Sequence, residues 1–194
     1  MASTLTSLAQ QKTAAELQTM SRKSMEWLMQ KIAVIRNPSG IADQIMAEKN
    51  RHTNAFMLGG LYCYYYDPKT KDDLPYYDIF PLVFPYKKTQ LGFIGLNMHY
   101  LPYQPRVLLL QRLMEYANNK KMDETTKLKY SWGLINGVTR FKWAEPCIHQ
   151  YLKPQIKSSL RRISPSDWAT AMLLPVEQFV GANKATVWAD SMGR

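Results

Sequence analysis

The chain has 194 residues, of which 46% are hydrophobic and 12% aromatic, and its formal net charge is +10. This length suits one domain with extensions, and the composition is sufficient for a sizeable core. The sequence lacks a signal-peptide pattern and any apolar run of the roughly 20 residues that a bilayer requires, so we expect no membrane partner.

The distribution of charge indicates the kind of partner, and the spacing of the two cysteines indicates whether a metal or disulfide site is present. Residues 101–194 carry 14 basic side chains against 7 acidic ones, which favours an acidic neighbour such as nucleic acid, although plain solubility explains the excess equally well. Cys63 and Cys147 have neither the spacing of a zinc site nor that of a disulfide framework. We therefore expect reduced thiols, no metal and no other cofactor.

The N-terminal part, residues 1–57, predicts a polar tail followed by a helical extension. Apolar side chains recur at spacings of three and four over residues 13–36, and the Asn-Pro-Ser-Gly sequence after them favours a helix end. A second short helix is expected over residues 41–50. The apolar face of the first helix packs either on the chain's own core or on another protein. The candidate interface on this face comprises Trp27, Leu28 and Ile32.

Residues 58–180 are expected to form an α+β core domain, with a small curled β-sheet or SH3-like barrel at residues 58–103. Alternation over residues 61–66 predicts a strand with three tyrosines on one face. Pro81 cannot donate to a sheet ladder, so the strand around it is expected to be an edge, to be bulged or to form two short pieces. Residues 91–100 carry the strongest strand pattern of the chain.

Helices are expected on the C-terminal side of this β region. One begins near Pro105, and the next follows Asp123, whose side chain suits an N-cap, and ends at Gly137. Residues 164–167 have the capping residues of a third helix start. The shorter predicted elements are a strand or extended link at 138–143, a short helix at 145–152, a strand at 155–163 and a turn of helix at 175–180.

The C-terminal arm, residues 181–194, is polar except for one apolar pair. An exposed tryptophan in a polar tail is typical of an anchor on a partner protein, and the alternative is that it folds back onto the chain's own core. Val187 and Trp188 therefore complete the candidate protein interface.

Six basic residues follow the predicted β region and alternate with aromatic ones. Basic side chains neutralise phosphates and exposed aromatic rings stack on bases, so this pattern favours contact with DNA. The same alternation also describes amphipathic strands whose polar face is merely solvated. The candidate nucleic-acid-binding residues are Arg140, Lys142, Lys153, Lys157, Arg161 and Arg162, with Phe141, Trp143 and Tyr151 between them.

Motifs for catalysis are missing from the sequence. It has no phosphate-binding loop, no nucleophile motif and no two histidines at metal-ligand spacing, so we expect no catalytic residue. His99, at the end of a predicted strand, is expected to be structural. One acidic cluster suggests a metal or nuclease site, but it lies mostly in turn-forming positions. Its members are Asp67, Asp72, Asp73 and Asp78.

Two long and unusual sequence words, YYYDPKTKDDLPYYDIFPLVFP and GFIGLNMHYLP, resemble a segment shared by particle proteins of contractile-tailed phages and their marine relatives. The resemblance is strong over residues 61–113 and continues weakly through DETTKLKYSWGL to PSDWATAMLLPVEQFVGANKATVWADS. It points to the DNA end protectors, which are head-completion proteins that cap the packaged genome end. The resemblance implies no catalytic residues.

The residues and the resemblance together predict a non-enzymatic structural component of a tailed bacteriophage particle. It would contact double-stranded DNA as a head-completion or genome-end-binding protein, in a symmetric multi-copy assembly with other phage structural proteins. The alternative is a tail or baseplate subunit that makes only protein–protein contacts. The expected location is the virion, and the host cytoplasm during assembly.

Overall fold

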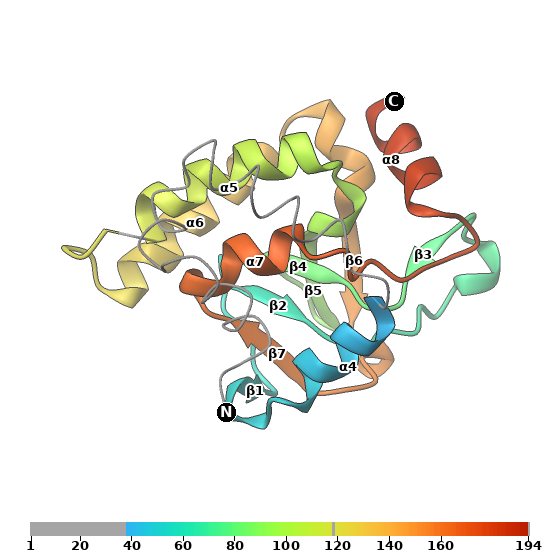
Figure 1. Cartoon of the computed structure of the whole chain (residues 1–194), viewed down its shortest axis with the longest axis horizontal. Coiled ribbons are helices and arrows are strands. Elements are labelled where there is room, and N and C mark those ends of the chain that lie inside the picture. The colour runs from blue at the N-terminus through green and yellow to red at the C-terminus, as the bar shows by residue number, and fades with distance from the viewer. Residues whose placement is uncertain (1–37, 118, 194) are drawn as a thin grey trace.

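The computed structural model describes residues 38–117 and 119–193 and shows an α+β fold, as the sequence predicts (Figure 1). Its centre is a six-stranded antiparallel sheet with the strand order β1-β7-β2-β4-β5-β6, and a two-stranded sheet pairs β3 with β8. The strands are β1 (His52–Thr53), β2 (Leu61–Cys63), β3 (Tyr77–Asp78), β4 (Leu82–Lys88), β5 (Gly92–Asn97), β6 (Ile148–Leu152), β7 (Leu160–Ile163) and β8 (Phe179–Val180).

The α-helices flank this sheet (Figure 1), and short 3-10 helices lie in the connections along the chain. Helices α5 and α6 pack side by side, and α8 packs against η3 and η4 (Figure 1). The α-helices are α4 (Pro38–Ala47), α5 (Tyr103–Ala117), α6 (Glu124–Val138), α7 (Trp168–Leu173) and α8 (Lys184–Gly193). The 3-10 helices are η1 (Lys49–Arg51), η2 (Lys71–Asp73), η3 (Met98–Tyr100), η4 (Lys142–Cys147), η5 (Lys153–Gln155) and η6 (Pro165–Asp167). None of the helices in the described ranges is long and apolar enough to cross a membrane.

Both faces of the sheet are buried, and the alternation along β2 explains why. Leu61 and Cys63 point into a large core with side chains of α4, α5 and α7, among them the fully buried Trp168. Tyr62, Tyr64 and Tyr66 point to the other face and join a smaller cluster with Phe93 and Tyr151. The predicted tyrosine face is therefore confirmed, and it is an interior layer rather than a solvated one. The segments that carry Phe56 and Ile156 cover it.

Of the two alternatives for residues 58–103, a curled sheet or an SH3-like barrel, the barrel is wrong. Within the described residues the six-stranded sheet is open, with β1 and β6 as its two edges. Two of its six strands, β6 and β7, come from residues 148–163 and pair with β5 and β2. In a barrel, the strands of residues 58–103 would have to pair with one another to satisfy their edges. Here the distant strands β6 and β7 provide those hydrogen-bond partners instead.

Several local predictions hold. The chain around Pro81 is divided into β3 and β4, because proline offers no N–H to a ladder. Asp123 caps α6, where its carboxylate accepts a hydrogen bond from the Thr126 N–H at 2.7 Å. The short helix predicted at residues 41–50 corresponds to α4 and η1, and its Ile45 is buried in the large core. The helix predicted over residues 13–36 lies outside the described residues, as do Trp27, Leu28 and Ile32.

Three other local predictions are wrong. The strand or link expected at 138–143 is the end of α6 and the start of η4. The helix expected at 145–152 is the end of η4 followed by β6, because Pro146 interrupts helical bonding and β5 offers a full ladder. The helical turn expected at 175–180 is extended and ends in β8, which pairs with β3. In the polar arm, residues 184–193 form α8.

Gly59 fixes the contact between α6 and the edge of the β region. Its φ is +80°, and its N–H donates to the Pro85 carbonyl at 3.0 Å. A Cβ atom at this position would lie 2.3 Å from the Leu128 carbonyl oxygen and 2.7 Å from the Trp132 nitrogen of α6. Only glycine allows both this backbone conformation and this close approach.

Candidate nucleic-acid interface

The structure distributes the six predicted DNA-binding residues over three places. One pair precedes β6 and a second pair follows it, so the length of the strand separates them. The third pair lies on β7. In the strand order, β7 is four strands away from β6, which corresponds to roughly 19 Å across the sheet. In this order the pairs are Arg140 and Lys142, Lys153 and Lys157, and Arg161 and Arg162.

Arg161 forms an intramolecular ion pair and is not available to DNA. Its side chain is fully buried, pairs with the Glu48 carboxylate and donates to the Glu48 carbonyl oxygen at 3.0 Å. Burial lowers the pKa of its guanidinium below the usual value. The pair joins β7 to the segment between α4 and η1, so the position that Arg161 occupies is structural. Sequence alternation could not reveal this, because Glu48 lies 113 positions away.

The five remaining cations all reach the surface, and of the three that follow β6, two have a carboxylate nearby. The Arg162 guanidinium lies 3.9 Å from Glu124, and the Lys157 ammonium lies 3.9 Å from Asp67. Arg162 lines a groove of about 530 Å³ together with Arg51, whose own guanidinium pairs with Asp167. Lys153 is exposed at the start of η5.

The first pair belongs to an exposed surface that we call the 140–143 surface: Arg140, Phe141, Lys142 and Trp143. Phe141 is 57% exposed and Trp143 is 37% exposed. Their ring centroids lie 6.3 Å apart and their planes are within 16° of parallel. The side chains of Arg140 and Lys142 are exposed and form no hydrogen bond or ion pair with any described residue.

Backbone turns hold the 140–143 surface in place. The Arg140 N–H donates to the Gly137 carbonyl at 3.2 Å, and the Phe141 N–H donates to the Val138 carbonyl at 3.0 Å. The next residue after the surface, Ala144, is fully buried. The surface is therefore a corner between α6 and η4 that presents two aromatic rings and two cations to solvent.

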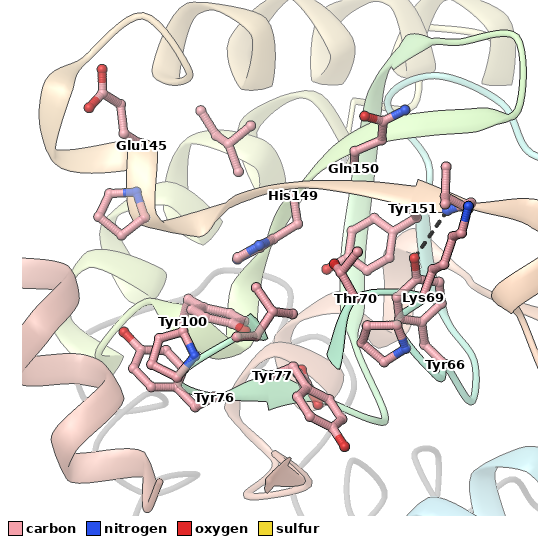
Figure 2. A pocket seen from close by; sticks show the side chains of 17 residues that line it. Tyr66, Lys69, Thr70, Tyr76, Tyr77, Tyr100, Glu145, His149, Gln150 and Tyr151 are labelled. Atoms are coloured by element: carbon pink, nitrogen blue, oxygen red, sulfur yellow. Dashed lines mark hydrogen bonds between the residues drawn. The ribbon is translucent and has the colours of Figure 1, made fainter. Parts of the chain in front are cut away.

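A separate cleft of about 550 Å³ lies between β6, η3 and the loop before β3 (Figure 2). Figure 2 shows His149 directed from β6 toward Tyr100, and the two ring centroids lie 4.2 Å apart. Burial lowers the pKa of His149 to about 4, so its imidazole is neutral at physiological pH. The tyrosines that line the cleft are Tyr66, Tyr76, Tyr77, Tyr100 and Tyr151.

A buried polar network lies behind this cleft. The Asp78 carboxylate accepts from the Phe80 N–H at 3.0 Å and from the Asn97 amide at 3.1 Å, and lies 2.8 Å from Nδ1 of His99. The Asn97 amide also donates to the Tyr151 hydroxyl at 3.1 Å. An aspartate that orients a histidine is a feature of hydrolase sites. Here both side chains are almost completely buried and the pair joins β3 to η3, while Asp78 is also one of the residues that line the cleft.

The acidic cluster proposed from sequence is dispersed. Asp78 belongs to the buried network, Asp67 pairs with Lys71 at 3.0 Å, and Asp72 and Asp73 are exposed in η2. Within residues 38–117 and 119–193, no three side chains of the His, Cys, Asp or Glu type stand close enough together to hold a metal ion.

The C-terminal pair folds back onto the chain. Val187 is fully buried, and the Trp188 indole N–H donates to the His99 carbonyl at 2.8 Å. Trp188 also lies against the Arg106 guanidinium, 5.3 Å from its ring centroid. This arrangement corresponds to the intramolecular alternative for the C-terminal arm.

The comparisons with known proteins identify a family. The family model described as "Phage T4 terminal DNA protecting protein" matches residues 2–191. The chain belongs to this family. The match confirms the resemblance to the DNA end protectors of contractile-tailed phages. Neither the curated proteins nor the solved structures gave a match.

The sequence pattern located the cations of the 140–143 surface but predicted a strand or extended link there, where the structure has the end of α6 and the start of η4. The same pattern does not distinguish exposed aromatic residues from buried ones. Tyr151 is 3% exposed and belongs to the core, whereas Phe141 and Trp143 are exposed. The buried Asp78–His99 pair had no local signal, because the two residues meet only when β3 approaches η3.

Proposed function

We propose that this chain binds and protects the ends of phage DNA as a structural, non-enzymatic component of the particle. The observation that carries the proposal is the match of a terminal DNA protecting family over residues 2–191, which is nearly the whole chain. This match supports a genome-end-binding, head-completion role over that of a tail or baseplate subunit. Such a protein works in the virion, in several copies and in contact with other particle proteins.

The 140–143 surface is the DNA contact that the described residues support best. Arg140 and Lys142 are exposed and have no carboxylate partner among the described residues, so no intramolecular ion pair must break before they meet a phosphate. The formal net charge of +10 attracts DNA to the whole chain. Lys153, Lys157 and Arg162 are further candidate phosphate contacts, on other parts of the surface.

The test is protection of linear double-stranded DNA from a duplex-specific exonuclease at low salt. We expect the full-length chain to slow digestion, and Arg140→Ala with Lys142→Ala to weaken this effect. Each lost phosphate contact should reduce the slope of log affinity against log salt by about 0.9, which gives a reduction of about 2 for the double variant. If the unmodified chain leaves the rate of digestion unchanged, the proposed function is wrong.

The chain offers a matched control for the charge change. Lys120 and Lys121 are likewise exposed and close in sequence, but they lie before α6, whereas Arg140 and Lys142 follow it. Helix α6 has 15 residues and thus a length of about 22 Å. Replacing both lysines with alanine removes the same charge and should leave most of the protection intact. Equal losses in both double variants would mean that only the net charge matters.

A further inference from the structure

We infer that Phe141 and Trp143 stack on the terminal base pair of a blunt DNA duplex and thereby distinguish a DNA end from internal DNA. This inference rests on the proposed function, which requires DNA binding but does not say how an end is recognised. It assigns the aromatic part of the 140–143 surface to the base-pair face and its cations to the adjoining phosphates.

A duplex end differs from internal DNA because one face of its last base pair is uncovered. Each internal base pair is covered on both sides by its neighbours, so a protein ring reaches its face only by unstacking two pairs, which costs a few kcal/mol per step. The last base pair exposes one face to water. An aromatic ring covers this face without unstacking, and stacking is tolerant of sequence because every base has a π-face.

The geometry of the two rings suits this partner. Because the ring planes lie within 16° of parallel, a planar group that lies parallel to one ring lies nearly parallel to the other. Phe141 and Trp143 are 57% and 37% exposed, although a fold that buries Phe80, Phe84 and Trp168 to within 2% has room for large rings in its core. Large aromatic groups that remain exposed beside each other indicate a binding surface.

The surrounding charges suit the same partner. Arg140 and Lys142 alternate with the two rings along the chain, so each ring has a cation next to it in sequence. At a duplex end the phosphates of the last nucleotides flank the base-pair face, where these cations can reach them. Glu145 is the acidic residue of η4 and is exposed three positions after Lys142. Two cations against one carboxylate leave this corner net positive.

The experiment compares two DNA forms as competitors for a labelled blunt duplex bound to the full-length chain. One competitor is the same blunt duplex without label, and the other is relaxed, covalently closed circular DNA at equal base-pair concentration. We expect the blunt duplex to compete at least about fivefold better, since one stacked base at about 1–3 kcal/mol corresponds to roughly a fivefold change in affinity or more. Phe141→Ala with Trp143→Ala should bring the two competitors to nearly equal strength while binding to the circle is retained.

Two further variants separate this role from others. Phe141→Tyr with Trp143→Phe keeps both rings and should keep the preference for ends. Tyr130 lies in the middle of α6, is 46% exposed and stacks on Tyr116. Tyr130→Ala removes this other exposed ring and should change neither the affinity for the blunt duplex nor that for the circle. Because each altered side chain is more than a third exposed, we expect all variants to fold, with at most a modest fall in unfolding temperature, which circular dichroism would verify.

Four results would overturn the inference. The first is a double alanine variant that keeps its preference for ends, and the second is one that loses affinity for both DNA forms equally, which would make the rings general DNA contacts. The third is tighter binding of single strands than of blunt duplex, which would indicate stacking on unpaired bases. The fourth is wild-type binding without any preference for ends. Absence of binding to either DNA form would instead refute the proposed function.

Discussion

Arg106 offers the sharpest test of what holds the C-terminal half together. It lies in the first turn of α5 and is fully buried. Its Nε donates to the Leu101 carbonyl at 2.5 Å, and its two Nη atoms donate to the carbonyls of Met172 and His99, each at 3.0 Å. The Glu177 carboxylate, also buried, lies 2.6 Å from Nη2. One side chain thus connects α5, η3 and the end of α7.

The cost of Arg106→Met follows from these contacts. Three hydrogen bonds from a charged donor, at about 1.5–3 kcal/mol each, set an upper range of about 4.5–9 kcal/mol. Removing one partner of a buried ion pair typically costs about 3–5 kcal/mol, because the other charge is left without compensation and the structure relaxes. We therefore expect a loss of about 4–5 kcal/mol, out of a total stability of about 5–15 kcal/mol for a domain of this kind.

Urea titration followed by tryptophan fluorescence measures this loss as a lower transition midpoint at an unchanged slope. Arg112→Met is the matched control, because Arg112 lies on the same helix, is 70% exposed and pairs with Glu115 at the surface. It should change the free energy of unfolding by less than about 0.5 kcal/mol. Replacing Arg106 and Glu177 together by methionine should recover part of the loss. A single variant Arg106→Met within 1 kcal/mol of the unmodified chain would refute the reasoning.

Three further outcomes are expected. Gly59→Ala should lower the free energy of unfolding by at least about 2 kcal/mol, because of its positive φ and the clash with Leu128. Gly133→Ala, in open space on α6, should raise it by about 0.5–1 kcal/mol. Equal effects of the two substitutions in urea titration would contradict this. Burial raises the pKa of Cys63 and of Cys147 to about 12, so iodoacetamide at pH 8 should label neither thiol in the native state and both in urea, as mass spectrometry would show. The folded pKa of His149, about 4, lies below the ordinary value of 6.5, so the stability that it contributes is complete above pH 6.5 and is lost as the pH falls toward 4, by at most about 3 kcal/mol. His149→Phe should flatten stability between these pH values, and an unchanged slope would show that the group is not protonated on unfolding.

Local chemistry was sufficient to predict part of this fold. The tyrosine alternation of β2, the break at Pro81 and the cap at Asp123 each follow from a few neighbouring residues, and the structure contains all three. Strands β6 and β8 could not be found in the same way, because each exists through pairing with a distant strand. Their sequences also suit short helices, and only the partner strand decides between the two.

The candidate site shows the same division. A pattern of basic and aromatic residues located the 140–143 surface, because its residues are neighbours in sequence. The pattern also included Arg161, which is held by Glu48 from another part of the chain. Exposure is decided by what packs over a residue, so sequence alone could not separate a cation free to meet DNA from one that joins two parts of the fold.

Because β7 lies between β1 and β2 in the sheet but follows them by about 100 residues in the chain, the sheet cannot be completed until late in synthesis. Arg161 meets Glu48 across 113 positions, and β7 supplies the hydrogen bonds for one whole side of β2. β7 lies about 100 positions after β2, so at about 5–20 residues per second the ribosome delivers it roughly 5–20 s later. During that time β2 has an open edge that can pair with another chain. A message truncated before residue 160 would make this state permanent, so we expect its product to aggregate rather than fold into a smaller version of the domain.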